Sequence, residues 1–258
     1  MSTDLVDTTQ MYLKAVWELE EEGIKPIRAR LAERLDQSKP TVSETVARLV
    51  RDGYVTIRER RVIELTHEGR SVALRIMRKH RLAEVLLYHV VGLAWEDVHE
   101  EACRWEHVMS VAVADKIAAL LPDVTSDPYG NPVPAAWTQP EGCDAHAFLD
   151  DAPMLGDALG SLPQDAETST CGLRVVRISE LTQVDRQLLA DLRECAIMPG
   201  QDIRASFVGN DGVDEAGQAR DGGARSVRIE GKTGALQIPL EFVDHIHVRV
   251  LQAEPQQS

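Results

Sequence analysis

The first 65 residues contain three short segments with helical periodicity followed by a charged hairpin, and this order restricts the possible fold more than any other feature of the sequence. Asp7 is suited to cap a helix start, and Gly23 is expected to end the first segment. Pro26 and Pro40 fit the first turns of the second and third segments, and Gly53 follows the third. The sequence therefore predicts three helices before residue 54.

A β-hairpin is predicted directly after these helices. Residues 54–58 and 62–65 are the two arms, and the charged tip between them is Glu59-Arg60-Arg61. Thr66 is expected to cap the next helix. Three helices and a charged hairpin are typical of a winged helix-turn-helix, a domain that places one helix in the major groove of DNA.

The charge distribution supports this interpretation, although the chain is acidic as a whole. The formal net charge is −14, which by itself argues against nucleic acid as a partner. Residues 24–61, however, contain ten basic and five acidic side chains, whereas residues 117–173 contain nine acidic side chains and no lysine or arginine. A local positive excess of this kind is the electrostatic signature of a DNA-binding surface.

Helical periodicity continues from residue 66 to about residue 121, which predicts two long amphipathic helices and no strand. The first is expected to run to about Val91 and break near Gly92. The second is expected to begin near Trp95 and to continue past Lys116. A pair of long helices suits a dimerisation domain.

A β domain is predicted in the C-terminal part, after an acidic linker. Residues 141–172 lack periodicity and are rich in acidic and small side chains, so a flexible linker is expected. Short strands with glycine-rich turns predict a small β-barrel, in which the loop of residues 209–225 is expected to be mobile. The predicted strands are residues 173–178, 202–207, 226–230, 235–238 and 245–250.

The expected fold is thus mainly α with a C-terminal β domain. The predicted domains are a winged helix-turn-helix (1–73), a helical dimerisation and metal-binding domain (74–140), the linker (141–172) and the β domain (173–258). The N-terminus resembles no secretion signal, and no apolar run approaches the roughly 20 residues that span a bilayer. A cytoplasmic location, reduced cysteines and no membrane partner are therefore expected.

Side chains that bind transition metals are concentrated in the two long helices. Cys103 and His107 are four residues apart and share a helix face, Glu106 lies beside them, and His99 lies one turn earlier. Thiolate, imidazole and carboxylate together are ligands of transition metals rather than of Mg²⁺ or Ca²⁺. The pattern predicts a metal site on this helix.

A second site is predicted where the two helices pack, because His80 and Glu84 on the first helix would then join His99. Plainer interpretations exist for each part. A His/Glu pair four residues apart is commonly solvated surface, and a lone cysteine on an amphipathic helix is commonly a small core residue. Six potential ligands on two neighbouring helices are harder to explain in this way, but spacing alone leaves both interpretations open.

Several motifs together resemble the diphtheria toxin repressor family, the iron-dependent regulators of actinobacteria. The resemblance is close over residues 5–134, and EACRWEHVMS at residues 101–110 is nearly diagnostic of the family. The C-terminal third is more weakly similar to the SH3-like third domain of the family, through SELTQ at residues 179–183. The other matching motifs are LVDTTQMYL (5–13), RARLAERLDQS (28–38), PTVSETVARL (40–49), MRKHRLAE (77–84) and GNPVP (130–134).

The resemblance implies two metal sites. The implied primary ligands are Met11, Cys103, Glu106 and His107. The implied ancillary ligands are His80, Glu84 and His99, with Glu180 and Gln183 reaching in from the third domain. Residue spacing alone does not identify Met11, whose thioether would tie the first helix to the metal.

The family implies Fe²⁺ as the activating metal, with Co²⁺, Ni²⁺, Zn²⁺ and Mn²⁺ as substitutes in vitro. The related manganese regulators have carboxylates where this chain has Met11 and Cys103, and sulfur ligands favour later metals over Mn²⁺. The alternative is a paralogue that responds to manganese or another divalent metal and has an altered operator preference.

The family also implies a homodimer that binds a palindromic operator of double-stranded DNA, with two dimers on one operator. Near the bases it places Ser38, Pro40 and Glu44; on the phosphates it places Arg28, Thr41, Ser43, Arg48, Arg51 and the wing residue Arg61. Lys39 is expected at the same DNA-binding surface, where it partly restores the positive charge that Glu44 removes. The family usually has Gln at position 44 and Gly at position 39. Because a carboxylate cannot donate a hydrogen bond to adenine, we predict a shifted or weaker operator preference. The alternative is that Glu44 caps its own helix through Thr41 and touches no base.

Two other functions remain as alternatives. A metalloenzyme built on the Cys103 helix would need an open metal position beside a substrate cleft and a general base, and no second motif supplies these. We therefore expect no enzymatic activity and no small-molecule substrate. A metal-independent regulator with vestigial ligands is disfavoured by the intact ligand identities. The β domain would either ligate the ancillary metal or bind a proline-rich segment.

Overall fold

A computed structural model describes residues 7–121, 124–134, 152–161, 171–208 and 226–251. These residues form two compact units, which divide between residues 150 and 151 and are described separately. Most of the predicted linker and the loop of residues 209–225 lie outside the described residues. Within the described ranges, no helix is both long enough and apolar enough to cross a membrane.

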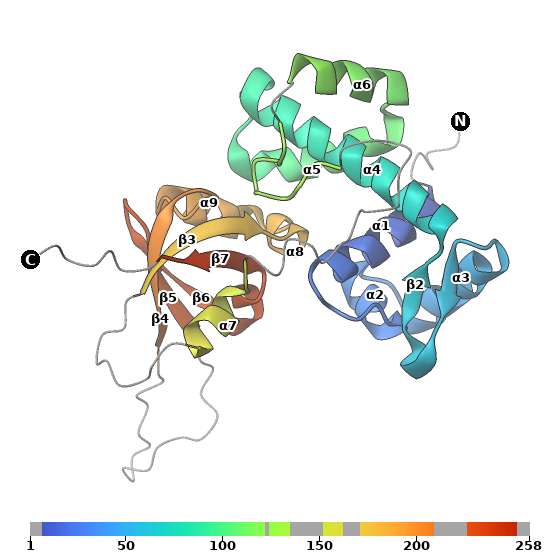
Figure 1. The fold of residues 1–258 in the computed structure, drawn as a ribbon, viewed down its shortest axis with the longest axis horizontal. Coiled ribbons are helices and arrows are strands. Elements are labelled where there is room, and N and C mark those ends of the chain that lie inside the picture. The colour runs from blue at the N-terminus through green and yellow to red at the C-terminus, as the bar shows by residue number, and fades with distance from the viewer. Residues whose placement is uncertain (1–6, 122–123, 135–151, 162–170, 209–225, 252–258) are drawn as a thin grey trace, which may run out of the picture. The chain divides into compact units, whose positions relative to one another are not determined.

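The first unit begins with the predicted winged helix-turn-helix (Figure 1). Its helices are α1 (Thr8–Glu21), α2 (Arg28–Arg34) and α3 (Lys39–Arg51), followed by the antiparallel hairpin of β1 (Val55–Ile57) and β2 (Ile63–Leu65). Apolar side chains from all three helices and both strands form one core. Arg60 and Arg61, at the tip of the hairpin, both have positive φ angles.

The predicted helix boundaries are largely confirmed, with one correction. The Asp7 side chain accepts a hydrogen bond from the backbone N–H of Thr9, and Gly53 follows α3 with a φ of 80°. Pro26, however, lies before α2 rather than in its first turn. Its carbonyl oxygen instead accepts a hydrogen bond of 2.7 Å from the backbone N–H of Ile63 in the hairpin.

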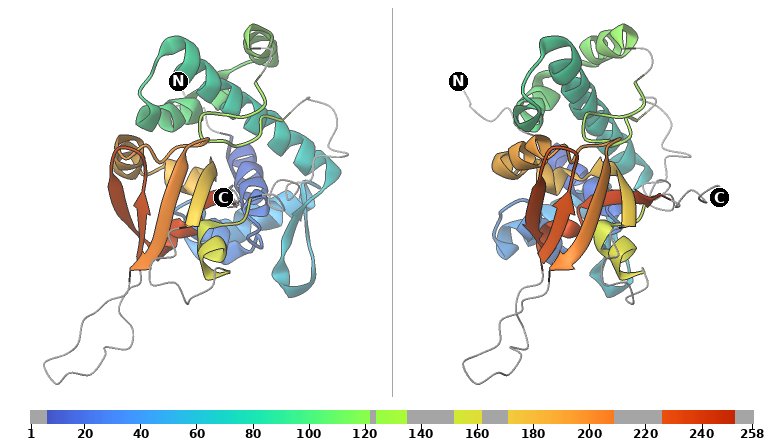
Figure 2. Two further views of the ribbon diagram at one scale, coloured as in Figure 1. Left: turned by 60° about the vertical axis from the view of Figure 1, so that its left-hand side comes forward. Right: turned by 90° about the vertical axis from the view of Figure 1, so that its left-hand side faces the viewer.

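A long helix, α4 (His67–Leu86), connects the hairpin to the rest of the first unit and packs against α1, α5 and α6 (Figures 1 and 2). It continues as a π-helical turn, Leu87–Val91, and stops at Gly92, as predicted. The second predicted long helix is wrong in one respect, because it is two helices, α5 (Trp95–Val108) and α6 (Val111–Leu120). Met109 is extended, and the Ser110 side chain caps α6 by accepting the N–H of Val113.

The second unit contains a five-stranded antiparallel sheet in the order β6-β5-β4-β3-β7, which confirms the predicted C-terminal β domain. Figure 2 shows the strands side by side. Their bounds are Cys171–Ile178 (β3), Asp202–Val208 (β4), Ser226–Glu230 (β5), Ala235–Pro239 (β6) and Ile246–Val250 (β7).

Four short helices of this unit were not predicted: α7 (Leu155–Gly160), α8 (Glu180–Gln183), α9 (Arg186–Glu194) and α10 (Leu240–Val243). Helix α7 corrects the expected linker over residues 152–161. Leu155 is fully buried, and Met154 forms a β-bridge with His247, so these residues belong to the second unit.

Candidate metal centre

The packing of α4 against α5 brings together ligand-type side chains that are 15 to 26 residues apart in sequence. His80 and Glu84 lie one turn apart on α4, and His99 and Cys103 lie one turn apart on α5. His80 and Glu84 are completely buried, and His99 is 7% exposed. Buried polar side chains at this density require mutual hydrogen bonds or a bound ion.

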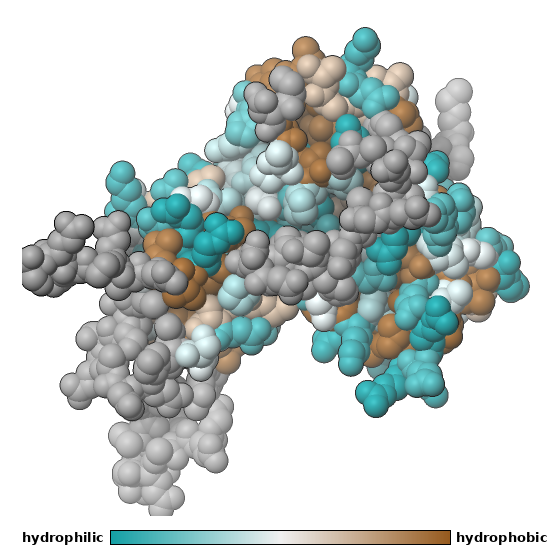
Figure 3. All heavy atoms as spheres, in the orientation of Figure 1, coloured by the Kyte–Doolittle hydropathy of each residue, from teal (hydrophilic) through white to brown (hydrophobic). Residues whose placement is uncertain are grey.

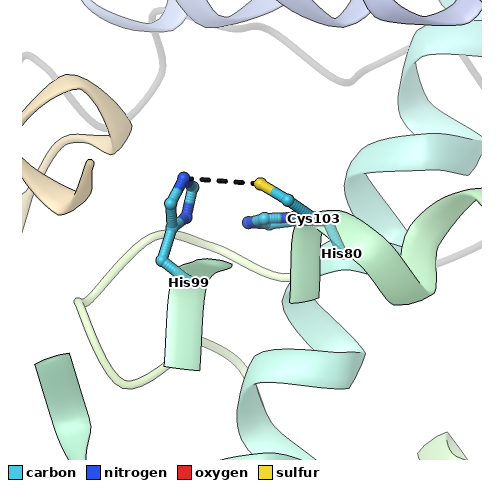
Figure 4. Close-up of side chains that lie close together, drawn as sticks. All are labelled: His80, His99 and Cys103. Carbon is cyan, nitrogen blue, oxygen red and sulfur yellow. Dashed lines mark hydrogen bonds between the residues drawn. The ribbon is translucent and has the colours of Figure 1, made fainter. Parts of the chain in front are cut away.

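Three of these side chains form a compact nitrogen and sulfur cluster (Figure 4). One ligand atom from each of His80, His99 and Cys103 lies within 4.8 Å of the others. The Cys103 Sγ is 3.5 Å from the His99 Nε2, and the two imidazole rings are 4.9 Å apart in an edge-to-face arrangement. Such a set suits a transition metal.

The His80 imidazole lies between two carboxylates. Its Nε2 is 2.8 Å from Glu84 Oε1, and its Nδ1 is 2.7 Å from Glu106 Oε2. Glu84 Oε1 is also 3.2 Å from the Nδ1 of His99. The residues expected at the primary and ancillary sites are therefore in direct contact, because His80 touches Glu106 and His99 touches Cys103.

His107 lies in the last turn of α5 and offers one further nitrogen to a metal ion. Its side chain is 10% exposed, and its Nε2 is 3.3 Å from Glu106 Oε1. Its Nδ1 is buried and has no hydrogen-bond partner among the described residues. An imidazole nitrogen held in this way is suited to coordinate a metal ion.

Helix α1 carries one residue that was expected at the metal and one that contacts the cluster. Met11, the ligand implied by family resemblance, is half-buried against the core, and no described contact joins its sulfur to the cluster. Lys14, one turn later, was missed by sequence analysis. Its Nζ donates to Glu106 Oε2 at 2.9 Å and lies 3.3 Å from His80 Nδ1. Its position three residues after Met11 was the only available signal.

The charges of the cluster shift the pKa values of its members. Burial by itself would raise the pKa of the Cys103 thiol, but Lys14, His99 and His80 outweigh it and lower that pKa to about 5. Burial likewise opposes ionisation of Glu106, yet Lys14 and His80 lower its pKa to about 2. The thiolate and the carboxylate are therefore ionised at neutral pH, which is the form that binds metals.

The two histidines shift in the opposite direction. Burial disfavours the charged imidazolium, but the Cys103 thiolate and the Glu84 carboxylate raise the pKa of His99 to about 10. The pKa of His80 is also raised, because Glu84 and Cys103 outweigh burial and the charge of Lys14. A metal ion that binds these nitrogens must displace their protons.

The two ligands expected from the C-terminal domain lie in the second unit, on α8. Glu180 is 5% exposed, and Gln183 is 1% exposed. The Gln183 Nε2 donates to the carbonyl oxygen of Ile178, and its Oε1 is buried without a hydrogen-bond partner among the described residues. Their part in an ancillary site stays a prediction.

The residues expected to contact DNA lie on exposed positions around α3. The buried side of α3 carries Val42, Val46 and Leu49. The expected contacts on α3 and its cap, residues 38–41, 43, 44, 48 and 51, are exposed, as is Arg61, whereas Arg28 on α2 is half-buried. The Ser38 side chain caps α3 and lies 2.8 Å from the hydroxyl of Thr41. Among the described hydrogen bonds, none joins Glu44 to Thr41.

Comparison with known proteins identifies the domains of the first unit. Residues 4–63 match the family described as "Iron dependent repressor, N-terminal DNA binding domain", and residues 66–135 match "Iron dependent repressor, metal binding and dimerisation domain". The diphtheria toxin repressor of Corynebacterium efficiens is 47% identical over 200 residues, which cover 78% of this chain and 83% of that protein. The iron-dependent repressor IdeR of Mycobacterium tuberculosis is 44% identical over 210 residues, which cover 81% and 88%.

Solved structures agree in fold. A manganese-dependent transcriptional repressor in complex with manganese has a TM-score of 0.68 at 29% identity and covers 95% of this chain and 100% of its own. The IdeR of T. acidophilum has a TM-score of 0.66 at 25% identity, with coverage of 95% and 99%. These relatives are named as transcriptional repressors, which is not an enzymatic role. The chain belongs to the family of iron-dependent, metal-binding repressors that includes the diphtheria toxin repressor.

Proposed function

We propose that this protein is an iron(II)-activated repressor of iron-uptake genes, which acts in the cytoplasm and binds palindromic operators as a homodimer. The proposal rests on one contact. The cluster of sulfur, imidazole and carboxylate groups on α4 and α5 touches helix α1, which belongs to the DNA-binding domain. A metal ion in this cluster would act directly on the domain that holds the recognition helix.

We assign the primary metal to Met11, Cys103, Glu106 and His107, and the ancillary metal to His80, Glu84 and His99 with Glu180 and Gln183. The Nδ1 of His107, which has no hydrogen-bond partner in the described part of the chain, and the lowered pKa of the Cys103 thiol support the primary set. When bound, the metal would neutralise the ligands and cross-link α1 to α5. Burial would help to exclude water from the metal, because Glu106 and the five ancillary residues are buried and Met11, Cys103 and His107 are partly buried.

Iron is the metal that the ligand set and the relatives favour. Sulfur ligands disfavour Mn²⁺ relative to later divalent metals, and Fe²⁺ is then selected by its availability in the cell rather than by affinity. Two of the curated relatives named above are an iron-dependent repressor, at 44% identity, and the diphtheria toxin repressor, at 47% identity. Manganese is the second candidate, since a structural relative is a manganese-dependent repressor.

Activation would follow from linkage between metal and DNA. If Met11 completes the coordination sphere only when α1 is set for DNA, metal and DNA raise each other's affinity by the same factor. The dimer that presents two recognition helices would form through exposed apolar side chains at the end of α5 and on α6 (Figure 3). These side chains are Val108, Val111, Val113 and Leu120, exposed by 60, 44, 51 and 71%. Two such dimers would share one operator.

A DNA mobility-shift series under anaerobic conditions tests the proposal. Fe²⁺ should increase the affinity for operator DNA by roughly 10²- to 10⁴-fold over chelator-treated protein, with Co²⁺, Ni²⁺ and Zn²⁺ acting as substitutes and Mn²⁺ weaker. Cys103→Ala should lose this metal response. Cys195→Ala, which alters a free cysteine in the second unit, should retain it.

Equal DNA binding with Fe²⁺ and with chelator would refute metal activation. A response to Mn²⁺ alone would establish the manganese alternative instead. Retention of the full metal response by Cys103→Ala would remove the sulfur ligand from the proposal.

A further inference from the structure

Lys14 is a buried lysine whose ammonium group lies within the proposed ligand cluster. It is 7% exposed, although lysine is seldom buried unless it is paired. Its Nζ is 2.9 Å from Glu106 Oε2 and 3.3 Å from His80 Nδ1. Helix α1 thereby supplies a positive charge to atoms on both α5 and α4.

An ammonium group and a metal ion compete for Glu106 Oε2 and His80 Nδ1. A protonated lysine has three N–H donors and no lone pair, so Lys14 cannot itself be a ligand. A transition metal approaches carboxylate oxygen and imidazole nitrogen to about 2.0–2.2 Å, well inside the distances at which the ammonium now lies. A divalent cation on Glu106 or His80 would face the positive charge of Lys14 at short range and within a buried site.

The structure also provides an alternative partner for the displaced ammonium. Glu18 lies one turn further along α1, and its Oε1 is 3.6 Å from the Nζ of Lys14. A small change in the Lys14 side chain would strengthen this pair while releasing Glu106. Glu18 is itself held by Arg34, whose guanidinium is 3.0 Å from its Oε2.

We propose that Lys14 is an internal counter-ion that occupies the place of the metal in the unloaded repressor and is displaced when the metal binds. Lys14 would then stabilise the metal-free cluster and weaken metal binding, and so set the metal concentration at which the repressor is loaded. It is a positioning residue on α1 rather than a ligand. The inference rests on the proposed function in one respect, that Glu106 or His80 coordinates the metal.

Removing the charge tests the inference. Lys14→Leu deletes the ammonium without adding a ligand atom, and Lys14→Arg keeps a positive charge. The affinity for Co²⁺, measured by chelator competition together with its thiolate absorbance, should become about tenfold tighter or more in Lys14→Leu. It should stay within about threefold of the parent in Lys14→Arg. Lys232→Leu, which changes an exposed lysine of the second unit, should leave it unaltered.

Thermal stability gives a second readout that does not depend on DNA binding. Without metal, Lys14→Leu should unfold at a lower temperature than the parent, because Glu106 loses its buried counter-ion. On addition of Co²⁺, the unfolding temperature of Lys14→Leu should rise by more than that of the parent. Where the metal-free variant is too unstable to titrate, loss of Co²⁺ from loaded protein on addition of chelator should be slower than in the parent.

Equal or weaker Co²⁺ binding by Lys14→Leu, or equal or faster loss of the ion, would overturn the inference. Tightening in Lys14→Leu that is matched by Lys14→Arg would also overturn it, because charge would not be the cause. Failure of the parent protein to bind any divalent metal would instead refute the proposed function.

Discussion

Glu44 is the one acidic side chain on the exposed side of the proposed recognition helix, where hydroxyls and arginines are its neighbours. A carboxylate accepts hydrogen bonds but cannot donate them, so it can pair with the N4 amino group of cytosine and not bidentately with adenine. It also repels phosphate. The side chain at this position should therefore determine base preference as well as affinity.

Glu44→Gln should shift the preferred operator toward adenine at the contacted position and strengthen binding to such sites by about tenfold, since a bidentate contact is worth roughly 1–3 kcal/mol. Selection of binding sites from a random DNA pool by both proteins would measure the shift. Glu64→Gln, which alters a carboxylate of the hairpin paired with Arg58, is the matched control. Identical selected sequences for the parent and Glu44→Gln would show that Glu44 does not read a base.

Side chains that share a face of one helix were easier to predict than contacts between helices. The spacing of Cys103 and His107, and of His80 and Glu84, indicated shared faces because helical periodicity is a local property. Lys14 was missed because its partner Glu106 is 92 residues away in sequence. Periodicity cannot show which face of α1 meets α5, and the charged end of a lysine on an amphipathic helix is ordinarily solvated.

At the level of the elements, α4 depends on a close approach between its first turn and the hairpin. The side chain of Thr66 caps α4 and donates to the carbonyl oxygens of Gly53 and Tyr54. Gly69 lies against the same place, where an added Cβ would be 2.0 Å from the carbonyl oxygen of Tyr54. The added Cβ would clash with backbone atoms, which cannot move aside as a flexible side chain can, so this position requires glycine.

Gly69→Ala should lower the free energy of unfolding by about 1–3 kcal/mol, because overpacking outweighs the gain in helix propensity of about 1 kcal/mol. Urea denaturation followed by circular dichroism, which reports on the helices of both units, would measure this change. Gly160→Ala, where an added Cβ meets nothing within 4 Å, should be neutral or slightly stabilising. A Gly69→Ala protein as stable as the parent would show that the hairpin adjusts without cost.

Elements with strong local signals were predicted well, and those defined by tertiary contact were not. Caps at Asp7 and Thr66 and the breaks at Gly53 and Gly92 are confirmed, since each depends on one residue type. The break at Ser110 was missed because apolar periodicity continues across it. The helices of the second unit were also missed, because segments as short as α8 and α10 have too few residues to show a period.

For the whole molecule, the two units carry buried histidines with opposite shifts in pKa. His99 in the first unit has its pKa raised to about 10. In the second unit, burial and the nearby charge of Arg177 lower the pKa of His247 to about 4, although its Nδ1 lies 3.0 Å from the carbonyl oxygen of Ala152. The units should therefore respond differently when the metal-free protein is acidified.

Proton linkage gives the direction in which each histidine changes folding stability with pH, when the pKa of histidine in the unfolded chain is about 6.5. His99 has a raised pKa in the folded state, so its contribution to stability is complete below about pH 6.5 and is lost as the pH rises toward 10. His247 has a lowered pKa, so the unfolded chain binds its proton first and stability falls between about pH 6.5 and 4. Acidification thus weakens the second unit while His99 adds no loss to the first.

Between pH 7 and pH 5 the second unit should lose about 2 kcal/mol through His247 alone. Hydrogen exchange of backbone amides in β3 and β7, compared with those in α4 and α5 and corrected for the intrinsic effect of pH, would measure this loss in chelator. His247→Gln can keep a donor toward the Ala152 carbonyl and removes the titrating group, so it should abolish most of the difference. If β3 and β7 kept equal protection at both pH values in the parent protein, the buried imidazole would not control the acid response of this unit. If His247→Gln lost protection on acidification as the parent does, another group would be responsible.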